Sequence, residues 1–184
     1  MMFKSLVLAA LCSVAVAGKC KPDTPATTVT GVASLTPDVT FGANVTGTVK
    51  MVQTGSAPAV IKVKLAGLTP GLHGFHIHEF GNIFPDCTAA GGHYNPFNKT
   101  HGAPDAATRH VGDLGNVEAR ADGTVDVEIT DTMVHLSGST SVIGRSFVIH
   151  AGVDDLGLGG HPLSNSTGNA GKRAACGVIG IGKN

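Results

Sequence analysis

The chain contains no tryptophan and a single tyrosine, and charged side chains make up only 14% of its 184 residues. Basic and acidic residues both number 13, so no excess of positive charge is available for a nucleic-acid backbone. Low charge combined with 42% hydrophobic residues also excludes a disordered chain. Glycine, in contrast, is abundant and occupies 26 positions. Because glycine permits tight turns, this composition favours one domain of short strands over long helices.

A long apolar run occurs only near the beginning of the sequence. One lysine precedes a mostly apolar stretch from Ser5 to Val16, and Ala15-Val16-Ala17 has the small-x-small pattern of a cleavage site. This stretch of about a dozen residues is shorter than the ~20 that a membrane helix needs. We therefore predict a secreted, extracellular protein without a membrane span. Its expected parts are a signal peptide at 1–17, an N-terminal tail at 18–28 and one domain at 29–184.

Export places the cysteines in an oxidising compartment, where disulfides form. Removal of the signal peptide, which contains Cys12, leaves Cys20, Cys87 and Cys176. Cys87 and Cys176 lie within the domain and Cys20 lies in the polar tail, so we predict a Cys87–Cys176 disulfide. Cys20 then either links two chains or is an exposed thiol. N-glycan acceptor triplets, which also arise by chance, begin at Asn44, Asn98 and Asn165.

Short segments of alternating polarity predict β-strands. Val60 to Leu65 and Val125 to Ile129 alternate apolar with charged residues, and Thr46 to Val52 follows the same pattern more weakly. Several short strands at this spacing favour an antiparallel sandwich or barrel. Two long glycine-rich stretches, Gly81 to Gly112 and Ala151 to Gly171, lack the alternation. Loops of that length in a small domain are usually functional.

Histidines gather in and around these stretches. His76 and His78 are two residues apart, and on a strand such residues point to the same face, so both rings can reach one ion. His150 follows the apolar segment Val142 to Ile149, which is predicted to run as a strand beside this pair. The first long loop and its end add His93, His101, His110 and Asp113. Imidazole-rich sets suit copper or zinc, and imidazoles with a carboxylate suit zinc. Ordinary hydrogen-bonded positions are expected for His73 and His135.

Four motifs, in this order along the chain, make the sequence resemble the copper/zinc superoxide dismutase family, in its secreted type. They are Gly71-Leu-His-Gly-Phe-His-Ile-His-Glu-Phe-Gly81, His110-Val-Gly-Asp-Leu-Gly-Asn116, Asp154-Asp-Leu-Gly157 and Gly168-Asn-Ala-Gly-Lys-Arg-Ala-Ala-Cys-Gly-Val-Ile-Gly180. The resemblance extends over residues 29–182. It implies an all-β fold, an eight-stranded, sandwich-like Greek-key β-barrel with two long functional loops.

The resemblance also implies one copper and one zinc ion per subunit. By position, the copper ligands are His76, His78, His93 and His150. The zinc ligands are His93, which bridges the two metals, His101, His110 and Asp113. Asp154 matches an aspartate that accepts ring N–H groups from His76 and His101. Thr167 matches a threonine that lines the substrate channel, and Arg173 an arginine that anchors the anion.

The implied activity is dismutation of superoxide to dioxygen and hydrogen peroxide by redox cycling of copper, with His93 and Arg173 as catalytic residues. Many family members guide the anion with charged residues in the second loop. Here the matching stretch, 161–166, has no charge unless His161 is protonated. We therefore expect Lys172 and Arg173 to be the cationic groups closest to the channel.

A homodimer is expected because Gly177 to Ile181 and Ile143-Gly144 match dimer-contact positions of the family. Asn82 to Asp86, in a region that usually serves dimerisation, departs from the common pattern. A secreted copper-binding or copper-delivery module on the same fold is the alternative function. Copper-chaperone relatives add thiol motifs, and neither Cys-x-Cys nor Cys-x-x-Cys occurs in the sequence. An inert adhesive domain would leave the histidines unexplained.

Overall fold

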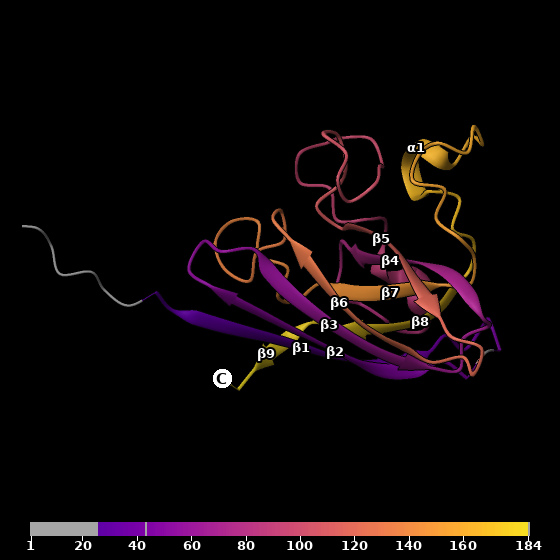
Figure 1. Ribbon diagram of the computed structural model, residues 1–184, viewed down its shortest axis with the longest axis horizontal. Helices are drawn as coiled ribbons and strands as arrows, with labels where there is room; N and C mark the ends of the chain where they lie inside the picture. Colours follow the sequence, from indigo (N-terminus) through magenta and orange to yellow (C-terminus); the bar gives the residue numbers. More distant parts are fainter. Residues whose placement is uncertain (1–25, 43, 184) are drawn as a thin grey trace, which may run out of the picture.

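Nine antiparallel strands and two short helices build the protein in the computed structural model, which describes residues 26–42 and 44–183 (Figure 1). The strands are β1 (Thr28–Pro37), β2 (Thr46–Thr54), β3 (Ala59–Ala66), β4 (Gly71–His78), β5 (Asp113–Ala119), β6 (Val125–Asp131), β7 (Ser146–His150), β8 (Arg173–Val178) and β9 (Gly180–Gly182). The helices are η1 (Cys87–Ala90) and α1 (Ser164–Thr167). The predicted signal peptide and Cys20 lie outside the described residues. None of the helices within them is long and apolar enough to cross a membrane.

Alternation along the strands decides which side chains enter the barrel. In β3, Ile61 and Val63 are fully buried, whereas Lys62 and Lys64 point outward. The two lysines pair with carboxylates of the neighbouring strand β6 at 3.3 and 3.1 Å. Because both pairs are solvent-exposed, the apolar inner face contributes most of the stability of this region.

The strands follow the order β5-β4-β7-β8-β1-β2-β3-β6, and β9 pairs with β1. The connections from β3 to β4 and from β6 to β7 cross between distant positions in this order, which produces the Greek-key arrangement. The result is a nearly closed barrel, as predicted, with β9 as a short additional strand. In Figure 1 the β4–β5 and β7–β8 connections, the second of which contains α1, project from the same side of the barrel.

The strand predicted at Val142 to Ile149 begins later than expected. β7 starts at Ser146, because the preceding residues form a turn in which the Arg145 amide donates to the Val142 carbonyl at 3.1 Å. Gly144 has a φ of 82° in this turn, a conformation that glycine adopts without strain. His150 is the last residue of the strand.

From His73 to His78, both faces of β4 are buried, which is unusual for a strand of an antiparallel barrel. Phe75 and Ile77 point into the core, where Phe75 stacks on Phe147 of β7 with ring centroids 5.1 Å apart. The alternate positions, His76 and His78, therefore face away from the core. They are nonetheless at most 1% exposed, because the two long loops cover this face.

Candidate metal centre

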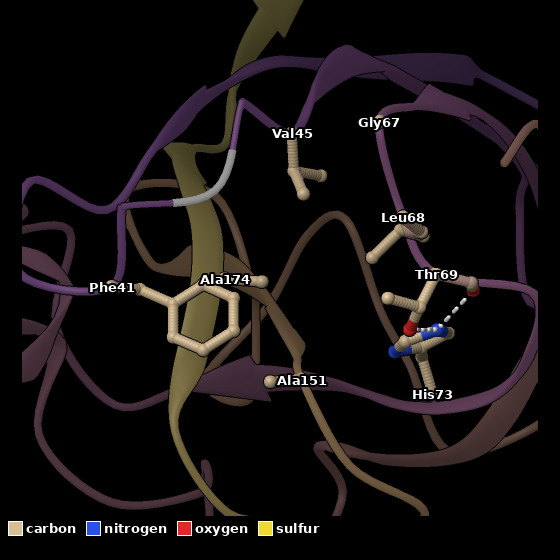
Figure 2. Close-up of a pocket in the computed structure, with 8 residues that line it drawn as sticks. All are labelled: Phe41, Val45, Gly67, Leu68, Thr69, His73, Ala151 and Ala174. Carbon is tan, nitrogen blue, oxygen red and sulfur yellow. Dashed lines mark hydrogen bonds between the residues drawn. The ribbon is translucent and has the colours of Figure 1, made fainter.

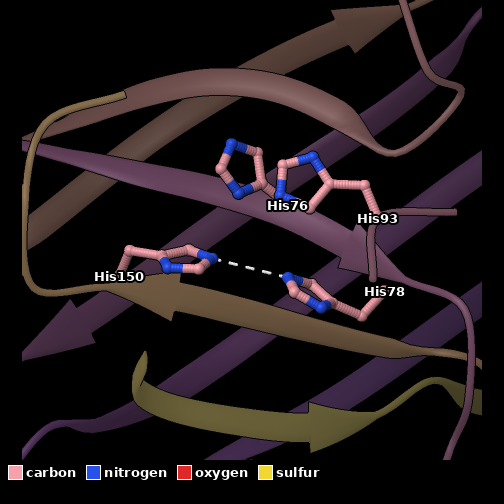
Figure 3. Close-up of side chains that lie close together, drawn as sticks. All are labelled: His76, His78, His93 and His150. Carbon is pink, nitrogen blue, oxygen red and sulfur yellow. Dashed lines mark hydrogen bonds between the residues drawn. The ribbon is translucent and has the colours of Figure 1, made fainter. Parts of the chain in front are cut away.

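Two groups of four ligand-type side chains lie side by side beneath the loops. The first contains His76, His78, His93 and His150 (Figure 3). The second contains His93, His101, His110 and Asp113. Every member is buried, and the ligand atoms within each group lie within 4.8 Å of one another. The structure thus brings together all seven residues that the sequence singled out, with His93 in both groups.

Strand and loop geometry places these rings. His76 and His78 come from β4, and His150 comes from the end of the adjacent strand β7. His93 belongs to the first loop, which returns to β4 and continues its hydrogen bonding: the amide of Tyr94 donates to the carbonyl of Ile77 at 2.8 Å. The loop therefore delivers His93 directly beside the histidine pair.

Backbone carbonyls fix the tautomers of His78 and His150. Their Nδ1 atoms lie 2.9 Å from the Gly91 oxygen and 3.1 Å from the Gly171 oxygen, respectively. A carbonyl oxygen only accepts hydrogen bonds, so each Nδ1 must carry the hydrogen. In the neutral ring, Nε2 then has a free lone pair. The two Nε2 atoms face each other at 3.4 Å (Figure 3).

Asp154 fixes two more rings from the second loop. Its Oδ2 accepts from Nε2 of His76 and its Oδ1 from Nε2 of His101, both at 2.8 Å. The opposite nitrogens, Nδ1 of His76 and Nδ1 of His101, are buried without a hydrogen-bond partner. Gly168 lies against this carboxylate, and a Cβ at that position would overlap the Asp154 side chain. By accepting the Nε2 hydrogens, Asp154 therefore leaves a free Nδ1 lone pair on His76 in the first group and on His101 in the second.

Three ring nitrogens converge on one oxygen of Asp113. The Nδ1 atoms of His93, His101 and His110 lie 2.8, 3.0 and 3.0 Å from its Oδ1. Nε2 of His110 already donates to the Lys99 carbonyl at 2.9 Å. In their neutral forms, His101 and His110 therefore direct Nδ1 lone pairs at the negatively charged Oδ1 of Asp113. Such an arrangement needs a positive charge among the three nitrogens and this oxygen. The donor set suits zinc, and the all-imidazole group beside it suits copper.

Burial keeps most of these rings neutral, which is the form that binds metal. It lowers the pKa values of His76 and His78 well below 6.5 and that of His150 to about 3. His101 differs: burial opposes its charge, but Asp113 and Asp154 outweigh burial and raise its pKa to about 9. Without a metal, a proton on His101 supplies part of the positive charge that the two carboxylates require.

A cavity of about 400 Å³ opens onto the first group. Its walls include His78, His93 and His150, together with Thr167, Lys172 and Arg173 of the second loop and β8. Among the described residues that line it, none is acidic. The Arg173 guanidinium is held by backbone carbonyls: Nη1 donates to Cys87 and Nη2 to Gly91, the latter at 2.6 Å.

The predicted disulfide is present. Cys87 of η1 and Cys176 of β8 are bonded, with Cα atoms 5.8 Å apart and a sequence separation of 89 residues. Both sulfur-bearing residues pack against Val148 of β7 and Ala90. The bond therefore attaches the beginning of the first loop to the strand that begins with Arg173.

His73 and His135 have ordinary hydrogen-bonded positions, as expected. The buried His73 ring lies 2.9 Å from the His150 oxygen and 2.8 Å from the Thr69 oxygen, beside a smaller cavity of about 110 Å³ (Figure 2). His135 lies 3.1 Å from the Gln53 amide nitrogen. Neither ring belongs to a metal-type group of the described residues.

Two supporting contacts were missed by the sequence analysis. Arg109 forms a buried ion pair with Asp131 at 2.6 Å and donates to the Asp113 carbonyl at 2.7 Å. Asn116 donates to the Asp154 carbonyl at 2.9 Å and accepts from its amide at 2.8 Å. Asn116 is the last residue of the motif that begins at His110, but only the fold reveals its partner. Arg109 carried no signal beyond its place next to a histidine.

A β-barrel with two abutting imidazole-rich groups that share one ring defines a metalloprotein with a paired metal centre. Residues 45–179 match the family model described as copper/zinc superoxide dismutase (SODC). Because the match covers most of the chain, the protein belongs to the copper/zinc superoxide dismutase family. It is therefore an oxidoreductase of the superoxide dismutase class.

Proposed function

We propose that each subunit holds one copper ion on His76, His78, His93 and His150 and one zinc ion on His93, His101, His110 and Asp113. The proposed reaction converts two superoxide anions and two protons to dioxygen and hydrogen peroxide. The observation that supports this assignment most strongly is the placement of His93. Its Nδ1 lies 2.8 Å from Asp113, while its buried Nε2 has no hydrogen-bond partner and faces the first group. One ring is thus shared by two sites.

When bound, copper supplies a one-electron redox couple and zinc supplies positive charge without redox chemistry. The chain itself provides proton handling and anion binding. His93 lines the cavity, and Asp113 occupies its Nδ1 while its Nε2 has no hydrogen-bond partner, so Nε2 is proposed to hold a proton and transfer it to the reduced oxygen species. Asp154 and the carbonyls of Gly91 and Gly171 keep the other rings in the tautomers that bind metal.

Arg173 is proposed to anchor the superoxide anion. Its side chain lines the cavity, and two carbonyl acceptors hold the guanidinium in one orientation. A guanidinium has five N–H donors, so donors remain for an anion after both carbonyls are satisfied. Thr167 lines the same cavity and is proposed to lie along the path of the anion.

The test combines metal analysis with superoxide consumption by the purified protein. We expect one copper and one zinc ion per chain and rapid consumption that disappears when the metals are removed and returns when they are restored. Bound copper without consumption, together with transfer of copper to an apo-protein acceptor, would instead support a copper-delivery module. A chain that retains no copper would contradict both functions.

We further propose that the protein is secreted and acts outside the cell. The apolar N-terminal stretch with its Ala15-Val16-Ala17 site supports this proposal. Residues Asn44, Asn98 and Asn165 are exposed, as glycan attachment requires. N-terminal sequencing of protein from the culture medium should begin at Gly18, and glycosidase treatment should lower its mass. Retention inside cells with an intact N-terminus would refute secretion.

A homodimer is proposed from exposed apolar side chains. Phe80, Phe84, Val178 and Ile181 are 51%, 80%, 40% and 76% exposed. Large exposed apolar groups of this kind often mark protein contacts. Sedimentation analysis should show a dimer for the natural chain and a monomer for Ile181→Glu. A non-reducing gel in denaturant shows whether Cys20 adds a covalent link between the two chains.

A further inference from the structure

Three turns in the described part of the chain share the pattern Asp-x-Thr. They are Asp38–Thr40, Asp86–Thr88 and Asp122–Thr124, and in each the aspartate Oδ1 accepts hydrogen bonds from the amide and the hydroxyl of the threonine. Such a turn needs only one carboxylate oxygen. In the sequence the three motifs look equivalent.

The second oxygen distinguishes Asp38 from the other two aspartates. Its Oδ2 accepts from the amide of Cys87 at 2.8 Å, across 49 residues of sequence. Asp38 is also only 3% exposed, whereas Asp122 is exposed at the surface. Burial by itself would raise the pKa of Asp38, but the bonds from Thr40 and Cys87 outweigh it and lower the pKa, so the buried carboxylate is ionised. Because a buried charge needs such hydrogen bonds, they hold the Asp38 carboxylate in one orientation.

Asp38 is connected to Arg173 from two directions. The amide of Cys87 donates to the Asp38 carboxylate, and the carbonyl of the same Cys87 accepts from Nη1 of Arg173. In addition, the backbone amide of Asp38 donates to the carbonyl of Ala174, the residue after Arg173, at 2.9 Å. The carboxylate charge also favours the protonated guanidinium, whose pKa burial lowers. Asp38 thus connects the main chain next to Arg173 with Cys87, whose carbonyl holds the guanidinium.

We propose that Asp38 is a positioning residue of the anion site, which holds Cys87 so that its carbonyl aims the Arg173 guanidinium into the cavity. The disulfide restrains the Cys87 side chain, and Asp38 restrains its main chain. This inference rests on the proposed role of Arg173 as the anion anchor. Loss of the Asp38 contact should let the guanidinium move and weaken anion binding while both metals stay bound.

Asp38→Asn tests the proposal, because an amide has one acceptor oxygen and cannot accept from both Thr40 and Cys87. Asp122→Asn is the matched control, since it makes the same chemical change in the same type of turn far from Arg173. The copper- and zinc-loaded variants are titrated with azide, and binding is followed by the visible absorption of Cu(II). We expect the azide Kd to rise about 3- to 10-fold in Asp38→Asn, as loss of one hydrogen bond would produce, and to stay unchanged in the control.

The same titrations in an Arg173→Ala background separate positioning from a general structural effect. If Asp38 acts through Arg173, the Asp38→Asn change should have no further effect there. Equal weakening in both backgrounds, or an unchanged azide Kd in Asp38→Asn, overturns the proposal. A natural chain that binds azide but does not consume superoxide would instead refute the proposed function.

A second variant covers the case in which Asp38→Asn does not load both metals. Thr40 is exposed, and Thr40→Val removes only its hydroxyl bond to Asp38, which leaves the carboxylate freer to turn. About a twofold rise in azide Kd is expected, absent in the Arg173→Ala background. No rise in either background would also count against Asp38 as a positioning residue.

Discussion

The Nε2 atoms of His78 and His150 lie 3.4 Å apart although each ring already donates its Nδ1 hydrogen to a backbone carbonyl. Two neutral rings held in this way direct lone pairs at each other, and they come from strands β4 and β7, which are paired in the barrel. A bound cation would relieve this repulsion, and the loop carbonyls of Gly91 and Gly171 hold both rings in the orientation that such an ion needs.

Replacing Asp154 should weaken both proposed metal sites. In Asp154→Asn the amide oxygen can accept from His76 or from His101 but not from both, so one ring loses its orientation. Loss of such a supporting contact lowers metal affinity by about 10- to 100-fold. Competition titrations with chelators measure the affinities for copper and zinc separately.

The adjacent Asp155 provides the control for this variant. Its carboxylate accepts from the Ser164 hydroxyl at 2.6 Å and from the Gly157 amide at 3.0 Å. Asp155→Asn should therefore change neither affinity by more than about twofold. If Asp154→Asn retains natural affinities at both sites, the role assigned to Asp154 is wrong.

Removing the disulfide should destabilise the metal-free protein most. A cross-link between residues 89 apart contributes roughly 4 to 5 kcal/mol in the chain-entropy model. The double variant Cys87→Ala, Cys176→Ala avoids an unpaired thiol, and its free energy of unfolding is measured in urea with and without metals. Because zinc and the disulfide restrain the same loop, we expect the loss to be smaller in the loaded protein. Equal unfolding free energies for the natural and double-variant metal-free proteins would contradict this.

The metal-free protein should lose stability in acid. His150 has a pKa of about 3 when folded and 6.5 when unfolded, so between these values the unfolded chain binds more protons. Stability therefore falls as the pH drops from about 6.5 toward 3, by up to ~1.4 kcal/mol per pH unit for each such ring. His101 acts in the opposite sense, because its pKa of about 9 gives stability that is lost as the pH rises through 9.

Urea unfolding of the metal-free chain between pH 7.5 and pH 4.5 checks this behaviour. In His150→Asn the acid decline should be shallower, because one buried ring no longer competes for a proton. His135→Asn, which replaces a ring outside the ligand groups, is the comparison and should retain the natural slope. A His150→Asn slope as steep as that of the natural chain would rule out His150 as a contributor.

Arg173 should contribute most of the electrostatic attraction between the cavity and the superoxide anion. Among the described cavity-lining residues only Lys172 and Arg173 have side chains that are always cationic at neutral pH. Interactions beyond the Debye length, about 8 Å at 0.15 M salt, are screened, whereas contacts at short range persist. We therefore expect the rate to fall only slightly as ionic strength rises.

Substitution at Arg173 tests the same point directly. Arg173→Ala should slow superoxide consumption by about tenfold or more with both metals bound, since a charge-assisted hydrogen bond is lost. Arg173→Lys should fall between, because an ammonium cannot reproduce the two-carbonyl clamp at Cys87 and Gly91. Lys172→Gln serves as the charge-matched comparison and should have the smaller effect. A steep salt dependence of the natural enzyme would mean that charges elsewhere guide the anion.

The sequence by itself determined the features that depend on neighbouring residues. Alternation of apolar and charged residues placed β3 and β6 correctly, and the two-residue spacing of His76 and His78 placed both on one face of a strand. The pattern failed at the beginning of β7, where the apolar residues Val142 and Ile143 suggested a strand but the chain forms a turn instead. There the tertiary path of the chain outweighed local propensity.

Contacts between distant residues were decided only by the tertiary structure. Asp154 meets rings 78 and 53 residues away, and Asp38 meets the Cys87 amide although its motif is indistinguishable from that of Asp122. The physical reason is that a strand's alternation is a property of consecutive residues, whereas the partner of a loop carboxylate depends on strand order and on how both loops fold over the barrel. Family motifs could indicate Asp154, but only the folded chain separates Asp38 from an ordinary turn.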